Sequence, residues 1–254
     1  MEQISYTKQR IALLDEVRGF SILCMVFYHF TFDLLLLFPI SFPFFYSPWM
    51  NGIRDIFAGI FIFISGCACR FSHNNCKRGL FCLLFGMIMT FVTIIVIPEQ
   101  QIIFGILHML GSCMILFSLV HPLLDQIKPS LALCLCIVLF LYTFQVAQKK
   151  FGIPYLFHFT LPSWLYQTNW LSPLGFYNEN FVSSDYFPLF PWMFLFFAGT
   201  IIGKWILQGQ CPNIIYQSHC PVLGAVGRHT IYIYLLHQPI LFTGLFLMKQ
   251  WVYA

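Results

Sequence analysis

The stretch ALLDEVRGFSILCMVFYHFTFDLLLLFPI, residues 12–40, combines a long apolar run with Arg18, His29 and Asp33. A run of this length can cross a bilayer as a single helix. An Asp or Arg at the centre of such a helix costs roughly 2.5–3.5 kcal/mol on insertion scales, and lipid tolerates these groups only where they face a bundle interior. The stretch therefore predicts a membrane helix that lines a polar site, not a simple anchor.

The whole chain has the composition of a polytopic membrane protein. Of its 254 residues, 59% are hydrophobic and only 9% are charged, whereas a soluble domain carries about 25% charged residues. The length allows about seven spans with short connections. We therefore expect an all-α transmembrane bundle, formed by one integral-membrane domain over residues 1–254, with membrane lipids as partners.

Seven uncharged or nearly uncharged runs define the expected spans. They cover residues 19–40, 53–71, 79–98, 102–124, 130–148, 186–203 and 230–248. The segment 151–185 is rich in aromatic residues and broken by three prolines. We interpret it as an interfacial loop outside the cytoplasm, because aromatic residues concentrate at the membrane–water interface. An eighth span within this segment is the alternative.

The distribution of Lys and Arg predicts the orientation of these spans. With the N-terminus inside, nine of the 13 basic residues fall in cytoplasmic segments and four in outer ones. The cytoplasmic ones are Lys8, Arg10, Arg18, Arg70, Lys77, Arg78, Lys128, Lys204 and Arg228, and the outer ones are Arg54, Lys149, Lys150 and Lys249. We expect a multi-pass protein of the cell membrane with a cytoplasmic N-terminus.

The charge pattern and the motifs disfavour several functional classes. No run of Lys or Arg is longer than two residues, so nucleic acid is not an expected partner. The pairs Cys67-Ala-Cys69 and Cys134-Leu-Cys136 lack the two-residue gap of a zinc or redox motif, and no metal site is expected. There is no Gly-rich phosphate loop, no Gly-x-Ser-x-Gly elbow and no His-Glu-x-x-His.

The first span carries the strongest chemical signal. Arg18 and His29 are eleven residues apart, which places them on one helix side and roughly 16 Å apart along the axis. Asp33 follows His29 by one turn. A carboxylate in this position can orient an imidazole as a general base. The alternative is a buried His–Asp pair that only holds helices together.

The mouth of the second span and the fourth span contain further candidates. Asn51 and Asp55 open the second span, where Asp55 either completes a site with His29 or forms a solvated cap with Arg54. His108, in the fourth span, is either a substrate ligand or a hydrogen-bonded packing residue.

The last spans add a third group of candidates. His237 and Gln238 lie within the final span, beside Pro239, which frees backbone groups there, so they either contact a cavity or serve packing. Asp185 contacts a polar acceptor or caps a helix. Arg228 holds a phosphate-bearing donor or merely follows the positive-inside rule.

These residues together resemble the family of the heparan-α-glucosaminide N-acetyltransferase catalytic domain, in its bacterial membrane members. The Arg18–His29 spacing is also similar to that of membrane O-acyltransferases that modify surface polysaccharides. The motifs that carry the resemblance are Leu14-Asp15-Glu16-Val17-Arg18-Gly19 with His29, Asn51-Gly52 with Asp55, Phe104-Gly105-Ile106-Leu107-His108, Asp185-Tyr186-Phe187-Pro188-Leu189-Phe190-Pro191-Trp192, Gly227-Arg228-His229 and Tyr234-Leu235-Leu236-His237-Gln238-Pro239.

The resemblance implies a membrane acyltransferase with acetyl-CoA as co-substrate and an amino sugar or glycan hydroxyl as acceptor. In the lysosomal member of the family a catalytic histidine precedes a Trp-Asn-Gly sequence. The matching stretch 46–52 has no histidine, so we expect His29 to serve as the base, oriented by Asp33 or Asp55.

The other candidates are expected to bind the donor or the acceptor; they are Arg18, Asn51, His108, Asp185, Arg228, His237 and Gln238. The rival hypotheses are a proton-coupled transporter or lipid-handling protein without acyl transfer, and a non-catalytic scaffold. A homo-oligomer is a further option that the sequence leaves open.

Overall fold

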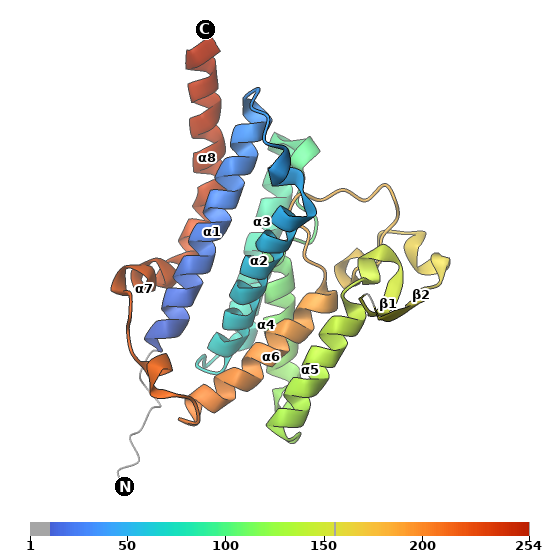
Figure 1. Cartoon of the computed structure of the whole chain (residues 1–254), viewed down its shortest axis with the longest axis vertical. Coiled ribbons are helices and arrows are strands. Elements are labelled where there is room, and N and C mark those ends of the chain that lie inside the picture. The colour runs from blue at the N-terminus through green and yellow to red at the C-terminus, as the bar shows by residue number, and fades with distance from the viewer. Residues whose placement is uncertain (1–10, 155, 254) are drawn as a thin grey trace. The chain divides into compact units, whose positions relative to one another are not determined.

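The computed structural model describes residues 11–154 and 156–253, and its helices are labelled in Figure 1. Among these residues, seven helices are long and apolar enough to cross a membrane. They are α1 (Ala12–Leu37), α2 (Pro48–Cys69), α3 (Asn75–Val96), α4 (Ile106–Leu124), α5 (Pro129–Thr143, extended by a 3₁₀ turn to Gln148), α6 (Leu189–Leu207) and α8 (Thr230–Tyr253). Each lies on one of the seven expected runs, so the prediction of an all-α transmembrane protein is confirmed.

The ends of these helices follow from local sequence chemistry. Helices α2 and α5 begin at Pro48 and Pro129, where the missing N–H of proline costs nothing because the first turn has no partner for it. Helix α3 is capped by Asn74, whose side chain accepts a hydrogen bond of 2.8 Å from the backbone N–H of Lys77. It ends at Val96, shortly before Pro98.

The segment 151–185 forms a loop with short elements of its own. Strand β1 (Lys150–Ile153) pairs antiparallel with β2 (Phe157–Thr160), and two short 3₁₀ turns follow. None of the described residues of this segment belongs to a helix of span length. The interfacial-loop interpretation therefore fits the structure better than an eighth span.

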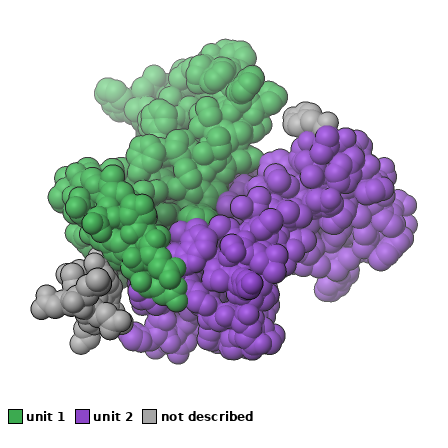
Figure 2. Space-filling model, turned by 60° about the horizontal axis from the view of Figure 1, so that its bottom comes forward, with its two compact units in different colours: residues 1–64, 208–254 green, residues 65–207 purple. Residues whose placement is uncertain are grey.

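The backbone forms two compact units, coloured in Figure 2. Unit 1 comprises Met1–Ile64 and Gln208–Ala254, and unit 2 comprises Ser65–Leu207, so α2 begins in one and ends in the other. In unit 1, α1 packs against α8 and against the short helix α7 (Pro221–Arg228). In unit 2, α3 packs on α4, and α6 contacts both α4 and α5. The expectation of one domain over residues 1–254 stays a prediction.

Glycines allow helix backbones to touch within each unit. A Cβ atom at Gly19 of α1 would meet the carbonyl oxygen of Leu223, and one at Gly227 of α7 would meet the carbonyl oxygen of Asp15. In unit 2, a Cβ atom at Gly79 would lie 2.7 Å from the carbonyl oxygen of Gly111. Such small-residue contacts are how membrane helices pack without a hydrophobic driving force between them.

The α1–α7 contact gives a testable prediction with a matched control. Gly227→Leu should lower the free energy of unfolding by about 1–3 kcal/mol, because the new side chain must displace the α1 backbone. Gly244→Leu is the control, since a Cβ atom at Gly244 of α8 has no neighbour within 4 Å. The measurement is the midpoint of heat-induced aggregation in detergent. Equal midpoints for the two variants would contradict the tight contact.

Helices α1 and α8 run parallel, as Figure 1 shows. Their contacts ascend together, from His29 with His237 and Asp33 with Gln238 to Phe38 with Tyr253. The first and last helices of a seven-span chain must be parallel if every span crosses the membrane, because each crossing reverses direction. The packing of unit 1 therefore agrees with an odd number of spans.

The orientation of the chain is a second prediction. Alkaline phosphatase fused after Tyr253 should be active in a bacterial host, because the basic residues place the C-terminus outside. The same reporter fused after Ile127, in the expected cytoplasmic α4–α5 loop, should be inactive. Activity of the second fusion and silence of the first would reverse the orientation. Of the basic residues that support it, Lys8 and Arg10 lie outside the described residues.

Candidate functional site

A polar site lies between α1 and α8 in unit 1. The ring centroids of His29 and His237 lie 5.1 Å apart, and the two ring planes are tilted by 57°. The Asp33 side chain is buried, and both of its oxygens accept hydrogen bonds of 3.0 Å from the amide nitrogen of Gln238. Four of the predicted site residues, from opposite ends of the chain, thus come together in the structure.

The His237 ring has a defined tautomer in this arrangement. Its Nδ1 lies 2.7 Å from the backbone carbonyl oxygen of Tyr234, one turn earlier in α8. A carbonyl oxygen only accepts hydrogen bonds, so Nδ1 carries the proton and Nε2 of neutral His237 is an acceptor. Nε2 is buried and has no hydrogen-bond partner in the described part of the chain.

The Gln238 amide has a defined orientation for a similar reason. An ionised carboxylate only accepts, so the nitrogen of the amide must face Asp33, as it does. The amide oxygen Oε1 then points elsewhere, and it too is buried without a partner among the described residues. Buried polar atoms are nearly always paired in native proteins. Nε2 of His237 and Oε1 of Gln238 are thus two buried acceptors that the described residues leave unpaired.

The mouth of α2 contributes charged residues to the same unit. Arg54 donates to Asp55 through Nε at 2.9 Å and through a terminal nitrogen at 2.8 Å. The guanidinium of Arg54 also lies within electrostatic reach of Tyr28 and His29. Sequence reasoning considered Arg54 only as the partner of a cap. Its charge at a span mouth, next to an intramembrane histidine, was the signal that could have added it to the site.

The expected orienting carboxylates have other partners. Asp33 is bound to Gln238, and Asp55 is bound to Arg54. Within the described residues, no hydrogen bond joins either carboxylate to His29. The orientation of His29 by Asp33 or Asp55 therefore stays a prediction. Asn51 lies exposed in the first turn of α2.

The opposite end of α1 is held by ionic contacts. Arg18 pairs with Asp15 at 3.1 Å, and its side chain is 18% exposed. Glu16 accepts from the Ser218 hydroxyl at 2.7 Å and from the backbone N–H of His219 at 2.9 Å. Arg228 is exposed at the end of α7. This end of unit 1 therefore carries two of the predicted donor-binding cations.

His108 and Asp185 lie in unit 2, where both organise the start of α4. The backbone N–H of Gly105 donates to Nδ1 of His108 at 3.2 Å, and the N–H of Ile106 donates to Asp185 at 3.2 Å. The first N–H groups of a helix have no partner within the helix, so both contacts satisfy otherwise unpaired donors. The contacts fit the hydrogen-bonded packing alternative for His108 and the helix-capping alternative for Asp185.

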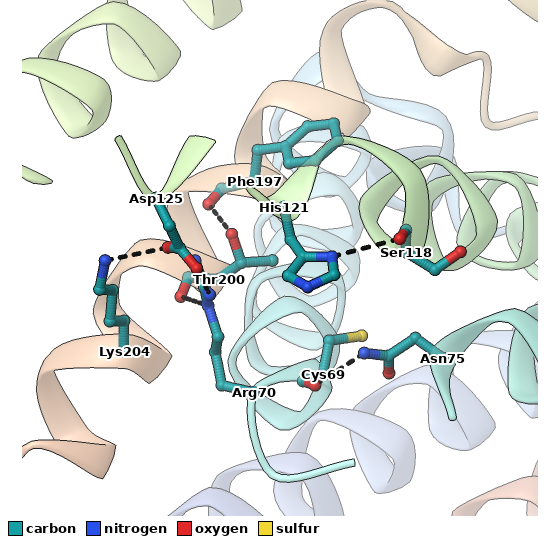
Figure 3. Close-up of polar contacts among 9 residues, drawn as sticks. All are labelled: Cys69, Arg70, Asn75, Ser118, His121, Asp125, Phe197, Thr200 and Lys204. Carbon is teal, nitrogen blue, oxygen red and sulfur yellow. Dashed lines mark hydrogen bonds and ion pairs between the residues drawn. The ribbon is translucent and has the colours of Figure 1, made fainter. Parts of the chain in front are cut away.

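A second polar cluster in unit 2 joins the ends of α2, α4 and α6, as Figure 3 shows. Two nitrogens of Arg70 donate to the two oxygens of Asp125, each at 2.9 Å, and Nε donates to the Thr200 carbonyl at 2.9 Å. Lys204 reaches Asp125 at 3.0 Å. One carboxylate thus serves two cations at what we expect to be the cytoplasmic surface.

The cluster makes the stability of unit 2 depend on pH. Partial burial raises the pKa of Asp125, but the hydrogen bonds and charges of Arg70 and Lys204 outweigh it, so this pKa lies below its ordinary value of 3.8. A lowered carboxyl pKa stabilises the fold above the unfolded-state value, and the contribution is lost as the pH falls through the folded-state pKa.

We therefore expect Asp125→Asn to destabilise the protein near neutral pH by about 1 kcal/mol, a value reduced for solvent screening because the Asp125 side chain is 33% exposed. The difference between variant and wild type should shrink below about pH 4, as wild-type Asp125 becomes protonated. Thermal unfolding midpoints at several pH values would measure it. A difference that stays constant with pH would exclude the ionic origin.

Comparison with known proteins gives one match. The family model described as heparan-alpha-glucosaminide N-acetyltransferase, catalytic, matches residues 10–239. The matched segment covers most of the chain and contains every site residue described above. No curated protein and no solved structure matches the chain.

Proposed function

The chain belongs to the heparan-alpha-glucosaminide N-acetyltransferase catalytic family, and from this membership we propose that it transfers an acetyl group from acetyl-CoA to an amino sugar or glycan acceptor across the cell membrane. The family is one of membrane acetyltransferases, and the chain is a multi-pass membrane protein. Membership of the family supports membrane acetyl transfer in general, and we propose acetyl-CoA as the donor and an amino sugar or glycan as the acceptor.

One observation carries the assignment of a catalytic centre to this chain. The His29–His237 contact and the Asp33–Gln238 hydrogen bonds lie between α1 and α8, two helices that are long and apolar enough to cross a membrane. Ionisable side chains within a membrane helix are expensive, and they are found mostly where they line a substrate or ion path. A pair of helices held together for stability alone would not need two facing histidines.

His29 is proposed as the general base. It removes a proton from the acceptor's nitrogen or oxygen as that atom attacks the thioester carbonyl carbon. The carbon–sulfur bond then breaks, and the proton passes to the departing thiolate of CoA. Arg54, held by Asp55, would supply positive charge to the oxyanion that forms on the carbonyl oxygen.

The donor is proposed to enter from the cytoplasmic end of α1. Arg18 and Arg228 lie at that end of unit 1 and can bind its phosphate groups, since charge-assisted contacts to phosphate are strong. The donor must then extend roughly 16 Å along α1 to bring its thioester to His29. Asn51, His108 and Asp185 remain predicted binding residues without an assigned contact to substrate.

The test is acetyl transfer by the purified full chain in proteoliposomes. His29→Ala should lower the transfer of radiolabelled acetyl from acetyl-CoA to extracted glycans by about 10²–10⁴-fold, the usual contribution of a general base. His158→Ala is the control, because His158 is an exposed histidine of β2. Size-exclusion profiles verify that both variants fold. Equal labelling by wild type and His29→Ala would remove His29 from this role.

A transporter function is the second candidate, since a buried His–His–Asp group can also relay protons. Solute uptake into proteoliposomes that follows a pH gradient, without consumption of acetyl-CoA, would support it. Acetyl transfer without such uptake would exclude it.

A further inference from the structure

Strands β1 and β2 form a two-stranded antiparallel sheet at one end of α5, as Figure 1 shows. The register brings together two apolar pairs, Phe151 with Phe159 and Ile153 with Phe157. Opposite residues of an antiparallel pair carry their side chains on the same face, and the two faces alternate along each strand. These four residues therefore share one side of the sheet, which we call its apolar face.

The other face of the sheet is polar. Its pairs are Lys150 with Thr160 and Gly152 with His158. The side chains of His158 and Thr160 are both exposed. The sheet is therefore amphipathic, and an antiparallel sheet of this kind places one face against an apolar phase and the other in water.

The protein covers only part of the apolar face. The rings of Phe151 and Phe157 pack edge-on against Tyr142 of α5, with centroid distances of 5.6 and 5.7 Å. Phe157 is nevertheless 39% exposed. Phe159, whose ring centroid lies 6.2 Å from that of Phe157, is 67% exposed. An exposed apolar patch marks a surface that a partner or a membrane covers.

Tyr142 connects the apolar face to an exposed stripe of α5. The stripe consists of Leu131, Leu135 and Val138, which are 60%, 48% and 41% exposed. These residues follow one another at spacings of four and three, so they lie on one side of the helix, and Tyr142 is the next position on that side. The apolar face of the sheet thus continues the exposed surface of α5 beyond the end of the helix.

A different side of α5 faces the protein. Ala132, Cys136 and Thr143 are buried, and Phe140 contacts Trp192 of α6 with ring centroids 6.0 Å apart. Because α5 is long and apolar enough to span a membrane, its exposed stripe is the surface that meets lipid. The continuity with this stripe identifies lipid as the medium next to the apolar face.

We propose that the apolar face lies in the membrane, at the boundary between the headgroups and the acyl chains of the leaflet where α5 ends. Phospholipid, and not a protein partner, then covers the exposed rings of Phe157 and Phe159. This contact tethers the segment 151–185 to the membrane surface. It goes beyond the proposed function and does not depend on acetyl transfer.

The backbone limits how deeply the sheet can lie. The outer edges of a two-stranded sheet carry N–H and C=O groups without a strand partner, and hydrocarbon offers them no hydrogen bonds. The strands therefore stay in the hydrated headgroup layer, while the side chains of the apolar face reach the acyl chains. The exposed His158 and Thr160 face the aqueous side in this position.

The first test places an environment-sensitive fluorescent amino acid at position 159, genetically encoded because the chain has ten cysteines. The full chain is reconstituted in phosphatidylcholine nanodiscs, where both membrane surfaces are open to added reagents. The fluorophore should be quenched by phospholipids that carry a spin label in the upper acyl chain, at a depth of about 5–10 Å, and protected from aqueous iodide. The matched control carries the fluorophore at position 158, on the polar face of the same strand, and should show the reverse pattern.

A second measurement uses charge and needs no fluorophore. Phe159→Asp places a carboxylate on the apolar face, where lipid cannot solvate it, so the sheet should leave the membrane. Trypsin should then cut after Lys149 and Lys150 about tenfold to a hundredfold faster than in wild type, the ratio expected from losing the burial of one phenylalanine. His158→Asp puts the same charge on the polar face and should keep the wild-type rate. Size-exclusion profiles verify that both variants fold.

Three results would overturn this placement of the sheet. Equal iodide quenching at positions 159 and 158 would show that the apolar face lies in water. Protection of position 159 from both iodide and spin-labelled lipid would show that protein covers it, either a second copy of the chain or another segment. Equal cleavage of Phe159→Asp and His158→Asp would exclude lipid as the medium that holds the sheet.

Discussion

Hydrocarbon offers no hydrogen bonds, and this constraint determines what α1 and α8 can be. Membrane helices tolerate the polar side chains of Asp33, Gln238, His29 and His237 there because these side chains contact one another. The Asp33–Gln238 contact in particular joins the first and last spans in parallel. It also orients the amide of Gln238, whose oxygen, like Nε2 of His237, is a buried acceptor without a hydrogen-bond partner among the described residues.

Within each unit, further contacts bring helix backbones close together. Unit 1 uses glycines at the α1–α7 contact, where no side chain fits between the backbones. Unit 2 uses a further glycine pair between α3 and α4, and it places the ion pairs of Asp125 at helix ends. Charges at helix ends can keep contact with water, whereas polar groups between α1 and α8 cannot. The free-energy cost of removing a charged or polar group from water thus explains two observations. Charged residues gather at the helix ends, and the polar groups between α1 and α8 are paired with one another.

Most of the fold was predictable, and only part of the site was. Hydropathy located all seven spans because a bilayer demands long apolar helices whatever the tertiary contacts. His29, Asp33, His237 and Gln238 were each recognisable as polar residues within apolar runs. Their partners were not, because Asp33 and Gln238 are 205 residues apart. For the same reason the sequence offered helix capping by Asp185 only as one of two alternatives, and it could not show that Arg54 comes near His29.

The sequence by itself determined a multi-pass helical membrane protein and a small set of polar residues that lipid cannot solvate. Those conclusions depend on composition and periodicity, which each segment carries alone. Only the tertiary structure decided that Asp33 binds an amide and not an imidazole, that His237 presents a bare nitrogen, and that Asp55 holds Arg54. These pairings depend on which helices pack together and on how they are shifted along their axes. Both are set by contacts between segments that lie far apart in the chain.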